Sequence, residues 1–123
     1  MSEVLAYVAG ALVGLWGVSH AIPTSQVVKG FEPITSDNRR VLVQEWLAEA
    51  FTMWGLAAVV IVSTAVGDPG STVTAWVYRV VAGLLLALAV LTGLTGARTP
   101  VIWFKICPVL LSTSAVLLLV ASA

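Results

Sequence analysis

The segment NRRVLVQEWLAEAFTMWG, residues Asn38 to Gly55, begins with two arginines and then enters apolar sequence that continues to Val66. About 20 mainly apolar residues are enough for a helix to cross the hydrocarbon core of a bilayer, so the stretch from about 41 to 66 predicts a membrane-spanning helix. Glu45 and Glu49 lie inside this stretch. The fold depends on whether the rest of the chain repeats the apolar pattern, and the function depends on what keeps the two glutamates there.

The composition of the whole chain agrees with a membrane protein. Apolar residues make up 59% of the chain, charged residues only 10%, and the mean hydropathy is +1.03. Soluble domains carry about a quarter charged residues. Six basic and six acidic residues give a formal net charge of zero, so no basic surplus attracts nucleic acid, which we exclude as a partner. The single cysteine, Cys107, cannot form a disulfide within the chain.

Three other runs have the length and composition of a span. The four predicted spans are about 4–21, 41–66, 74–96 and 101–121. Short connections between long helices imply antiparallel neighbours. We therefore predict an all-α fold, an integral membrane four-helix up-down bundle, in a single transmembrane domain of residues 1–123. The first span lacks a basic leader and a small-residue cleavage site, so we expect a retained helix rather than a signal peptide.

The basic residues predict how the bundle is oriented. Five of the six fall in or beside the connections 22–40 and 97–100, namely Lys29, Arg39, Arg40, Arg98 and Lys105. Arg79 is the exception. By the positive-inside rule, these two connections are cytoplasmic and both termini lie outside a cell inner membrane.

Small residues recur at three- and four-residue spacing on one face of the first span: Ala6, Gly10, Gly14, Gly17 and Ala21. The third span has similar pairs, Gly83 with Ala87 and Ala89 with Gly93. Such strips let helices approach closely. They indicate either packing within the chain or the seat of a second protomer, in a homo-oligomer or a larger membrane complex.

Ionisable residues gather at the predicted cytoplasmic end of the bundle. Glu45 and Glu49 are four residues apart and share a helix face, where two ionised carboxylates repel each other unless cations or a proton intervene. A charge inside the bilayer costs about 2.5–3.5 kcal/mol on insertion scales, so such groups usually face the interior and carry function. We therefore expect Glu49 to face the interior within reach of His20, Lys105 or an arginine. The candidate ligand-binding residues of this polar cluster are His20, Arg39, Arg40, Glu45, Trp46, Glu49 and Lys105.

Simpler roles for the same side chains stay open. The arginines and Lys105 can extend their charged ends to lipid headgroups, and His20 can cap or pack the turn before Pro23. The connection 22–40 is long for so small a bundle, and it predicts either a lid over the polar cluster or a segment resting on the headgroups.

The motifs of common catalytic and metal sites are absent. The chain has no HExxH, ExxH, CxxC, GxSxG or phosphate-loop sequence, and one histidine with two glutamates is too small a set of ligands for a metal. We predict no metal site, and the cofactor is unknown, with a haem held by His20 alone as the weakest of the possibilities.

The stretch from Ser19 to Ala50 resembles a set of small bacterial four-helix membrane proteins. It carries their H-x-x-P-T, G-F-x-x-I-S-x-D-N-R-R and E-W-x-x-E-G patterns as HAIPT, GFEPITSDNRR and EWLAEA, departing at Thr35 and Ala50. The resemblance implies the four-helix membrane fold and no particular activity. More distantly, the chain is similar to DoxX-like and sterol-isomerase-like membrane proteins, which hold polar residues around an apolar ligand cavity.

Three functions fit these patterns. The leading hypothesis is a binding protein or accessory membrane subunit whose helices enclose a hydrophobic small molecule, such as a quinone, a sterol-like or a lipid-derived ligand. The first alternative is an isomerase-type enzyme in which Glu49 or Glu45 moves a proton, assisted by His20 or Lys105. The second is a proton-coupled transporter or channel built from several protomers, with Glu49 as the proton carrier.

The predicted orientation is testable by labelling. Single cysteines introduced at Thr35 and Ser71 in intact cells should react from the cytoplasmic and the external side respectively, because the positive charges gather beside the first of these positions. The opposite pattern would move the polar cluster to the external face.

Overall fold

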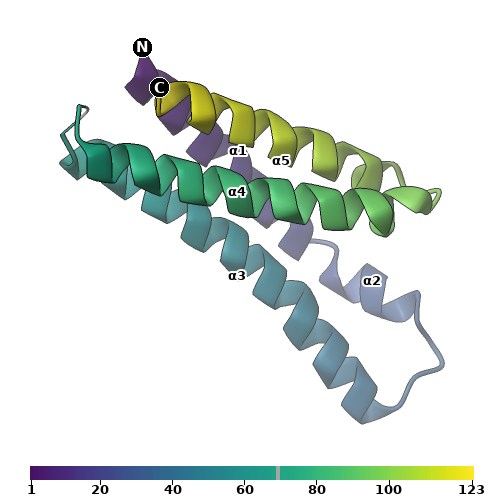
Figure 1. Ribbon diagram of the computed structural model, residues 1–123. Helices are drawn as coiled ribbons and strands as arrows, with labels where there is room; N and C mark the ends of the chain where they lie inside the picture. The colour runs from purple at the N-terminus through teal and green to yellow at the C-terminus, as the bar shows by residue number, and fades with distance from the viewer. Residues whose placement is uncertain (69) are drawn as a thin grey trace.

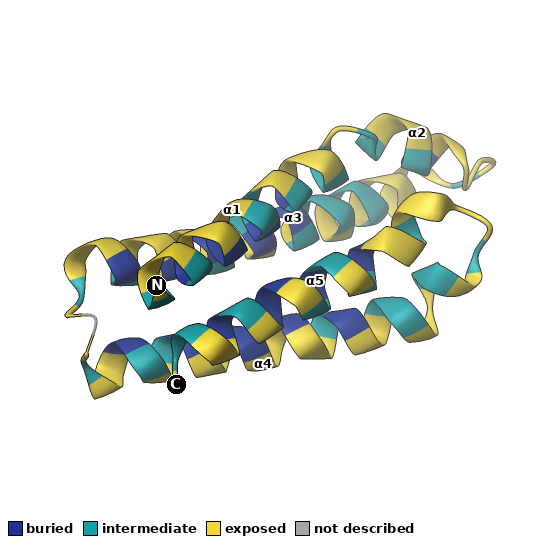
Figure 2. Ribbon diagram, turned by 90° about the horizontal axis from the view of Figure 1, so that it is seen from above, coloured by how far each residue is buried: buried dark blue, intermediate teal, exposed yellow. Residues whose placement is uncertain are grey.

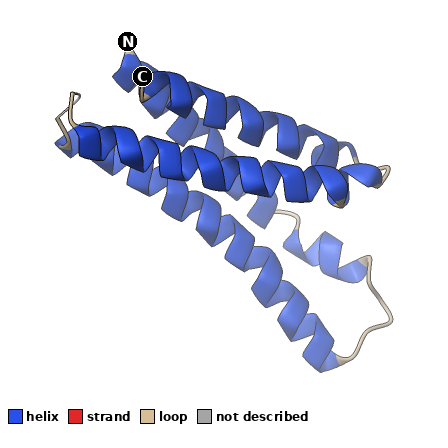
Figure 3. Ribbon diagram, in the orientation of Figure 1, coloured by secondary structure: helices blue, strands red, loops and turns tan. Residues whose placement is uncertain are grey.

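The computed structural model describes residues 1–68 and 70–123, and these residues form helices and connecting loops with no strand (Figure 3). Pro69, in the predicted connection between the second and third spans, lies outside the described residues. The helices are α1 (Ser2–Ala21), α2 (Thr24–Lys29), α3 (Ser36–Val66), α4 (Thr72–Leu94), the 3-10 helix η1 (Gly96–Arg98) and α5 (Ile102–Ala121). The four long ones, α1, α3, α4 and α5, are long and apolar enough to cross a membrane. The predicted all-α fold with four such helices is confirmed.

The second long helix begins earlier than the sequence predicts. Thr35 is the N-cap, and its hydroxyl accepts a hydrogen bond from the Asn38 backbone N–H at 3.2 Å. Asp37 then lies in the first turn, where a negative charge is favourable. With 31 residues, α3 is about 46 Å long, well over the roughly 30 Å of a bilayer core. The short helix α2, in the connection 22–40, was not predicted.

The extent of contact differs between the pairs of long helices. α1 lies against α3 and α5, and α4 lies against α5 (Figure 1). α3 meets α4 near the connection between them, where the hydroxyls of Thr64 and Tyr78 are 2.7 Å apart, and the first half of α3 then diverges from α4. The buried residues lie on the facing sides of the helices and the exposed ones on the outside (Figure 2). The two termini lie at the same end of the molecule.

Glycines set the distance between α1 and α3. A Cβ at Gly17 would lie 2.7 Å from Nε1 of Trp54 and 3.2 Å from the backbone oxygen of Ala50, and one at Gly14 would lie 3.5 Å from the Ala57 side chain. Later positions on α1 therefore meet earlier positions on α3, so the two helices run in opposite directions. The small-residue strip of the first span is confirmed as packing within the chain.

Most of the small residues predicted as a strip on α4 do not contact another helix of the chain. A Cβ added at Gly83 or Gly93 would have no neighbouring atom within 4 Å, and Ala87 is exposed. Only Ala89 of the predicted pairs is buried, against α5 and its neighbours. Among the described residues, the Gly83 face of α4 is thus not used for packing within the chain.

The close approach of α1 to α3 predicts that two glycine-to-alanine substitutions differ in their effect on the free energy of unfolding. Gly17→Ala should lower stability by about 1–3 kcal/mol, because the new methyl group overlaps the rigid indole of Trp54 and the Ala50 carbonyl. Gly55→Ala, also in a long helix but with nothing within 4 Å of the new Cβ, should be neutral or stabilising by up to about 1 kcal/mol. Thermal unfolding of the protein in detergent, followed by circular dichroism, compares the two. Equal midpoints would show that Gly17 does not set the helix separation.

Candidate functional site

The last turn of α1 is joined to α3 by His20 and Trp46. The indole N–H of Trp46 donates to the backbone oxygen of His20 at 2.8 Å, and Nε2 of His20 lies 3.1 Å from the backbone oxygen of Trp46. The two rings stack, with centroids 4.0 Å apart and planes 16° from parallel. A carbonyl oxygen only accepts, so Nε2 carries a hydrogen in this contact. Two reciprocal hydrogen bonds and a stacked pair hold the end of α1 against one position on α3.

Glu49 lies one turn further along α3 and faces the same histidine. Its Oε2 atom is 3.4 Å from Nε2 of His20, and the side chain of His20 is 8% exposed while that of Glu49 is 35% exposed. The prediction that Glu49 comes within reach of His20 is confirmed. The carboxylate is thus supported from the inside by an imidazole and remains open on its outer side, so it can accept a hydrogen bond or a proton from a group that approaches the helix surface.

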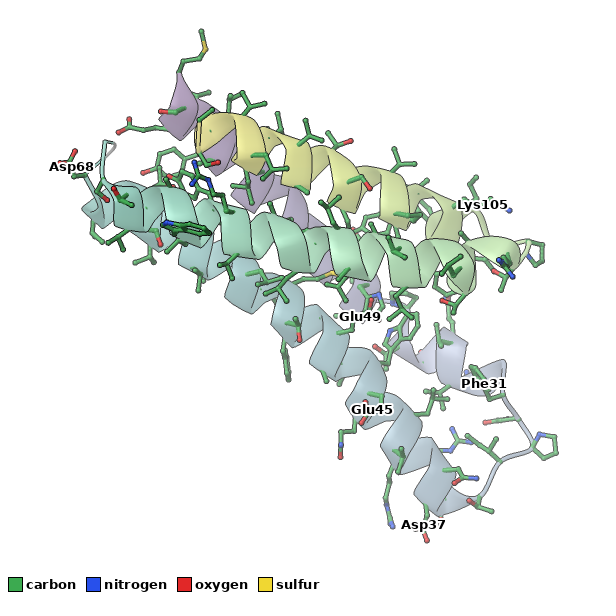
Figure 4. All side chains as sticks on the ribbon, viewed as in Figure 1. Phe31, Asp37, Glu45, Glu49, Asp68 and Lys105 are labelled. Carbon is green, nitrogen blue, oxygen red and sulfur yellow. The ribbon has the colours of Figure 1, made fainter. Side chains whose placement is uncertain are left out.

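The other members of the predicted cluster have different partners. The Gln44 amide donates to Glu45 at 3.2 Å, the Arg40 side chain pairs with Asp37 at 3.2 Å, and Arg39 pairs with Glu32. The Lys105 ammonium donates to the Ala97 backbone oxygen at 3.0 Å. Figure 4 shows Lys105 at the far end of α5 and Glu45 pointing away from the other long helices. The expectation that these charges surround one interior pocket is therefore corrected.

The reason lies in the lengths of the helices. α1 ends at Ala21, so no long helix stands opposite the part of α3 that precedes Trp46, and Glu45 faces outward although it shares a helix face with Glu49. Lys105 is on α5, which packs against α1 and α4, so its side chain reaches back to the preceding connection. The structure brings together His20, Trp46 and Glu49 only.

Two aromatic contacts near this site were missed by sequence reasoning. Phe104, on α5, meets the Trp46 ring edge-on with centroids 6.1 Å apart. Trp16, one turn before His20 on α1, donates its indole N–H to the sulfur of Cys107 at 3.2 Å. Both contacts connect α5 to the α1–α3 pair. The only signal in the sequence was the presence of aromatic residues near the predicted cytoplasmic ends of the spans.

The core where the four long helices meet is filled. Between Ala9, Val13, Ala57 and Leu85 there is no room for a water molecule. The connection 22–40 instead forms an open groove of about 440 Å³ between α2 and the start of α3. Within residues 1–68 and 70–123, no three histidine, cysteine, aspartate or glutamate side chains are grouped closely enough to hold a metal ion.

Comparisons with models of protein families, with curated proteins and with solved structures found no match to this chain. The resemblance of residues 19–50 to small bacterial four-helix membrane proteins therefore stays a prediction.

The ring stacking predicts how accessible His20 is to a chemical probe. His20 is the single histidine of the chain, so histidine modification by diethyl pyrocarbonate reports on this residue alone. Trp46→Ala should raise the modification rate, because it removes the stacked ring that covers the imidazole. Trp103→Ala, which removes an indole 63% exposed on α5, is the matched control and should leave the rate unchanged. An unchanged rate in Trp46→Ala would show that the ring does not shield His20.

Proposed function

We propose that the chain is a multi-pass protein of a cell inner membrane, an up-down bundle with both termini outside, which binds a hydrophobic small molecule at the site formed by His20, Trp46 and Glu49. The ligand is a quinone, a sterol-like or a lipid-derived compound with a polar end. The same site would serve an accessory subunit that presents such a ligand to a larger membrane complex.

Helix lengths support a position for the site at the edge of the bilayer core. α1 has 20 residues, about 30 Å, which matches the thickness of the core, and His20 is near its end. Counting a similar length back along α3 from Val66 also reaches the region of Trp46. On this placement Glu49 lies about one turn, roughly 5 Å, inside the core. Trp46 then occupies the interfacial level at which tryptophan is enriched.

The half-exposed carboxylate of Glu49 is the observation that carries the proposal. An ionised group exposed to acyl chains is costly, so the open side of a carboxylate at this depth favours a second partner besides its neighbour in the chain. Glu49 is held on one side by His20 and is open on the other. A ligand with a hydroxyl or N–H group would complete its hydrogen bonding at the surface of the bundle.

The filled core favours a ligand that lies against the bundle rather than inside it. With no room for a water molecule between Ala9, Val13 and Leu85, an enclosed ligand would require the helices to separate. Apolar side chains exposed on α3 and α4, such as Phe51 and Leu91, would contact the body of a ligand whose polar end reaches Glu49.

Proton transfer is the second candidate function, favoured by the 3.4 Å contact between His20 and Glu49. An imidazole beside a carboxylate can pass a proton between them, as either an acid–base enzyme or a proton-coupled transporter requires. A transporter would need several protomers, for which the Gly83 face of α4 offers a site of close approach. Turnover of a substrate favours the enzyme, and proton flux in liposomes favours the transporter.

Native mass spectrometry of the protein released gently from its membrane tests the binding proposal. Glu49→Gln keeps the size of the side chain and removes its charge, so it should reduce the occupancy of a copurified ligand about tenfold, the loss expected for one hydrogen bond to a charged group. The bundle should stay folded, since Glu49 is not fully buried.

Glu45→Gln is the matched control for this experiment. Glu45 lies on the same helix, is exposed and accepts a hydrogen bond from its neighbour Gln44, so its substitution should leave ligand occupancy unchanged. Equal loss in both variants would indicate a general effect of charge on α3. Equal occupancy in Glu49→Gln and the unaltered protein would separate the carboxylate from binding.

A further inference from the structure

The open groove between α2 and the start of α3 combines apolar and cationic walls. Ile22 and Val28 supply apolar surface from the α1–α2 segment, and Val43 supplies it from α3. Lys29, at the end of α2, and Arg39, in the first turns of α3, line the same groove. One groove therefore offers two positive charges beside a hydrocarbon surface.

The two cations can take a further partner. No ion pair of Lys29 occurs within the described parts of the chain. Arg39 pairs with Glu32, but both side chains are nearly half exposed, and such a pair contributes little and leaves other guanidinium N–H groups available. Ser25 also lines the groove. These donors match the oxygens of a phosphate.

The position of the groove favours a lipid over a soluble anion. Ile22 directly follows the last residue of α1, a helix whose length matches the bilayer core, so the groove opens at the level of the headgroups. A free phosphate would use Lys29 and Arg39 but not the three apolar side chains. A phospholipid would use both walls, and a space of about 440 Å³ suits a headgroup with the first methylenes of its chains rather than a whole lipid.

We propose that this groove is a binding site for an anionic phospholipid, with the phosphate between Lys29 and Arg39 and the start of an acyl chain against Ile22 and Val43. The site is separate from Glu49. It rests on insertion of the four long helices in a membrane, and it holds whether or not a ligand binds at Glu49.

Lipid titration measured by native mass spectrometry tests the proposal on the full-length protein in detergent. The probes are dioleoyl-phosphatidylglycerol and dioleoyl-phosphatidylcholine, which share their acyl chains and differ in net charge. The unaltered protein should bind the anionic lipid more tightly. Lys29→Gln and Arg39→Gln should each weaken that binding about fivefold, the effect expected for one basic residue near a bilayer surface, and should leave the zwitterionic lipid unaffected.

Three controls make the result specific. Lys105→Gln removes an exposed cation from the same end of the bundle but outside the groove, and should not change the preference. Lys29→Arg keeps a positive charge in the groove and should keep the preference for the anionic lipid. Glu45→Gln, which removes an exposed charge of α3 outside the groove, should also leave the preference unchanged, so an effect of the groove is distinguishable from a general effect of charge at this end of the bundle.

The apolar wall is tested with Ile22→Gln, a change at a side chain that is 77% exposed and not needed for folding of the core. It should weaken binding of phosphatidylglycerol but not of glycerophosphoglycerol, the same headgroup without acyl chains. If the soluble headgroup binds as tightly as the lipid, the groove is a site for free phosphate compounds and the proposal fails. It fails equally if Lys105→Gln reduces the preference as much as Lys29→Gln does.

Discussion

The close contact between α1 and α3 is the constraint on which the rest of the structure depends. Gly17 leaves no room for a methyl group beside Trp54, so the register in which the two helices pack requires a glycine at this position. The Trp54 indole N–H donates to the Gly14 backbone oxygen at 3.2 Å and helps to hold that register. One turn beyond Gly17, the same register brings His20 against Trp46 and Glu49. The polar site is therefore a consequence of the small residues of α1, although none of them belongs to it.

The difference in length between the same two helices explains why charged residues gather at the start of α3. The helix exceeds a bilayer core by about ten residues, at 1.5 Å of rise per residue, and its charges precede or adjoin the level where α1 ends. Glu45 and Arg40 are exposed, and they need no partner inside the bundle because α1 does not extend to their level. Glu49 is the one carboxylate of α3 beyond that level, and it is the one that meets His20.

Much of the fold could be predicted from the sequence, because span length and small-residue spacing act locally along each helix. The approximate positions of the four long helices and the use of Gly10, Gly14 and Gly17 followed from those patterns. The cost of a charge in the bilayer predicted that Glu49 would meet His20, Lys105 or an arginine, and of these the structure has His20. The separation of the charges into pairs such as Arg39 with Glu32 and Arg40 with Asp37 could not be predicted from those patterns. Which of several cations reaches a carboxylate depends on where the neighbouring helix ends, and the sequence did not predict the start of α3 at Ser36 or the helix α2.

The polar end of the molecule consequently has two regions with opposite charge preferences. Around Glu49 a carboxylate is open to the surface and favours donors, whereas the groove beside Lys29 and Arg39 favours acceptors. Only Ala21, Ile22 and Pro23 separate His20 from α2, so both regions depend on how the end of α1 is held. The hydrogen bond from Trp46 to the His20 backbone fixes that end by its main chain, independently of the charge on the imidazole. The two regions are therefore joined by a main-chain contact in which neither the Glu49 carboxylate nor the cations of the groove take part.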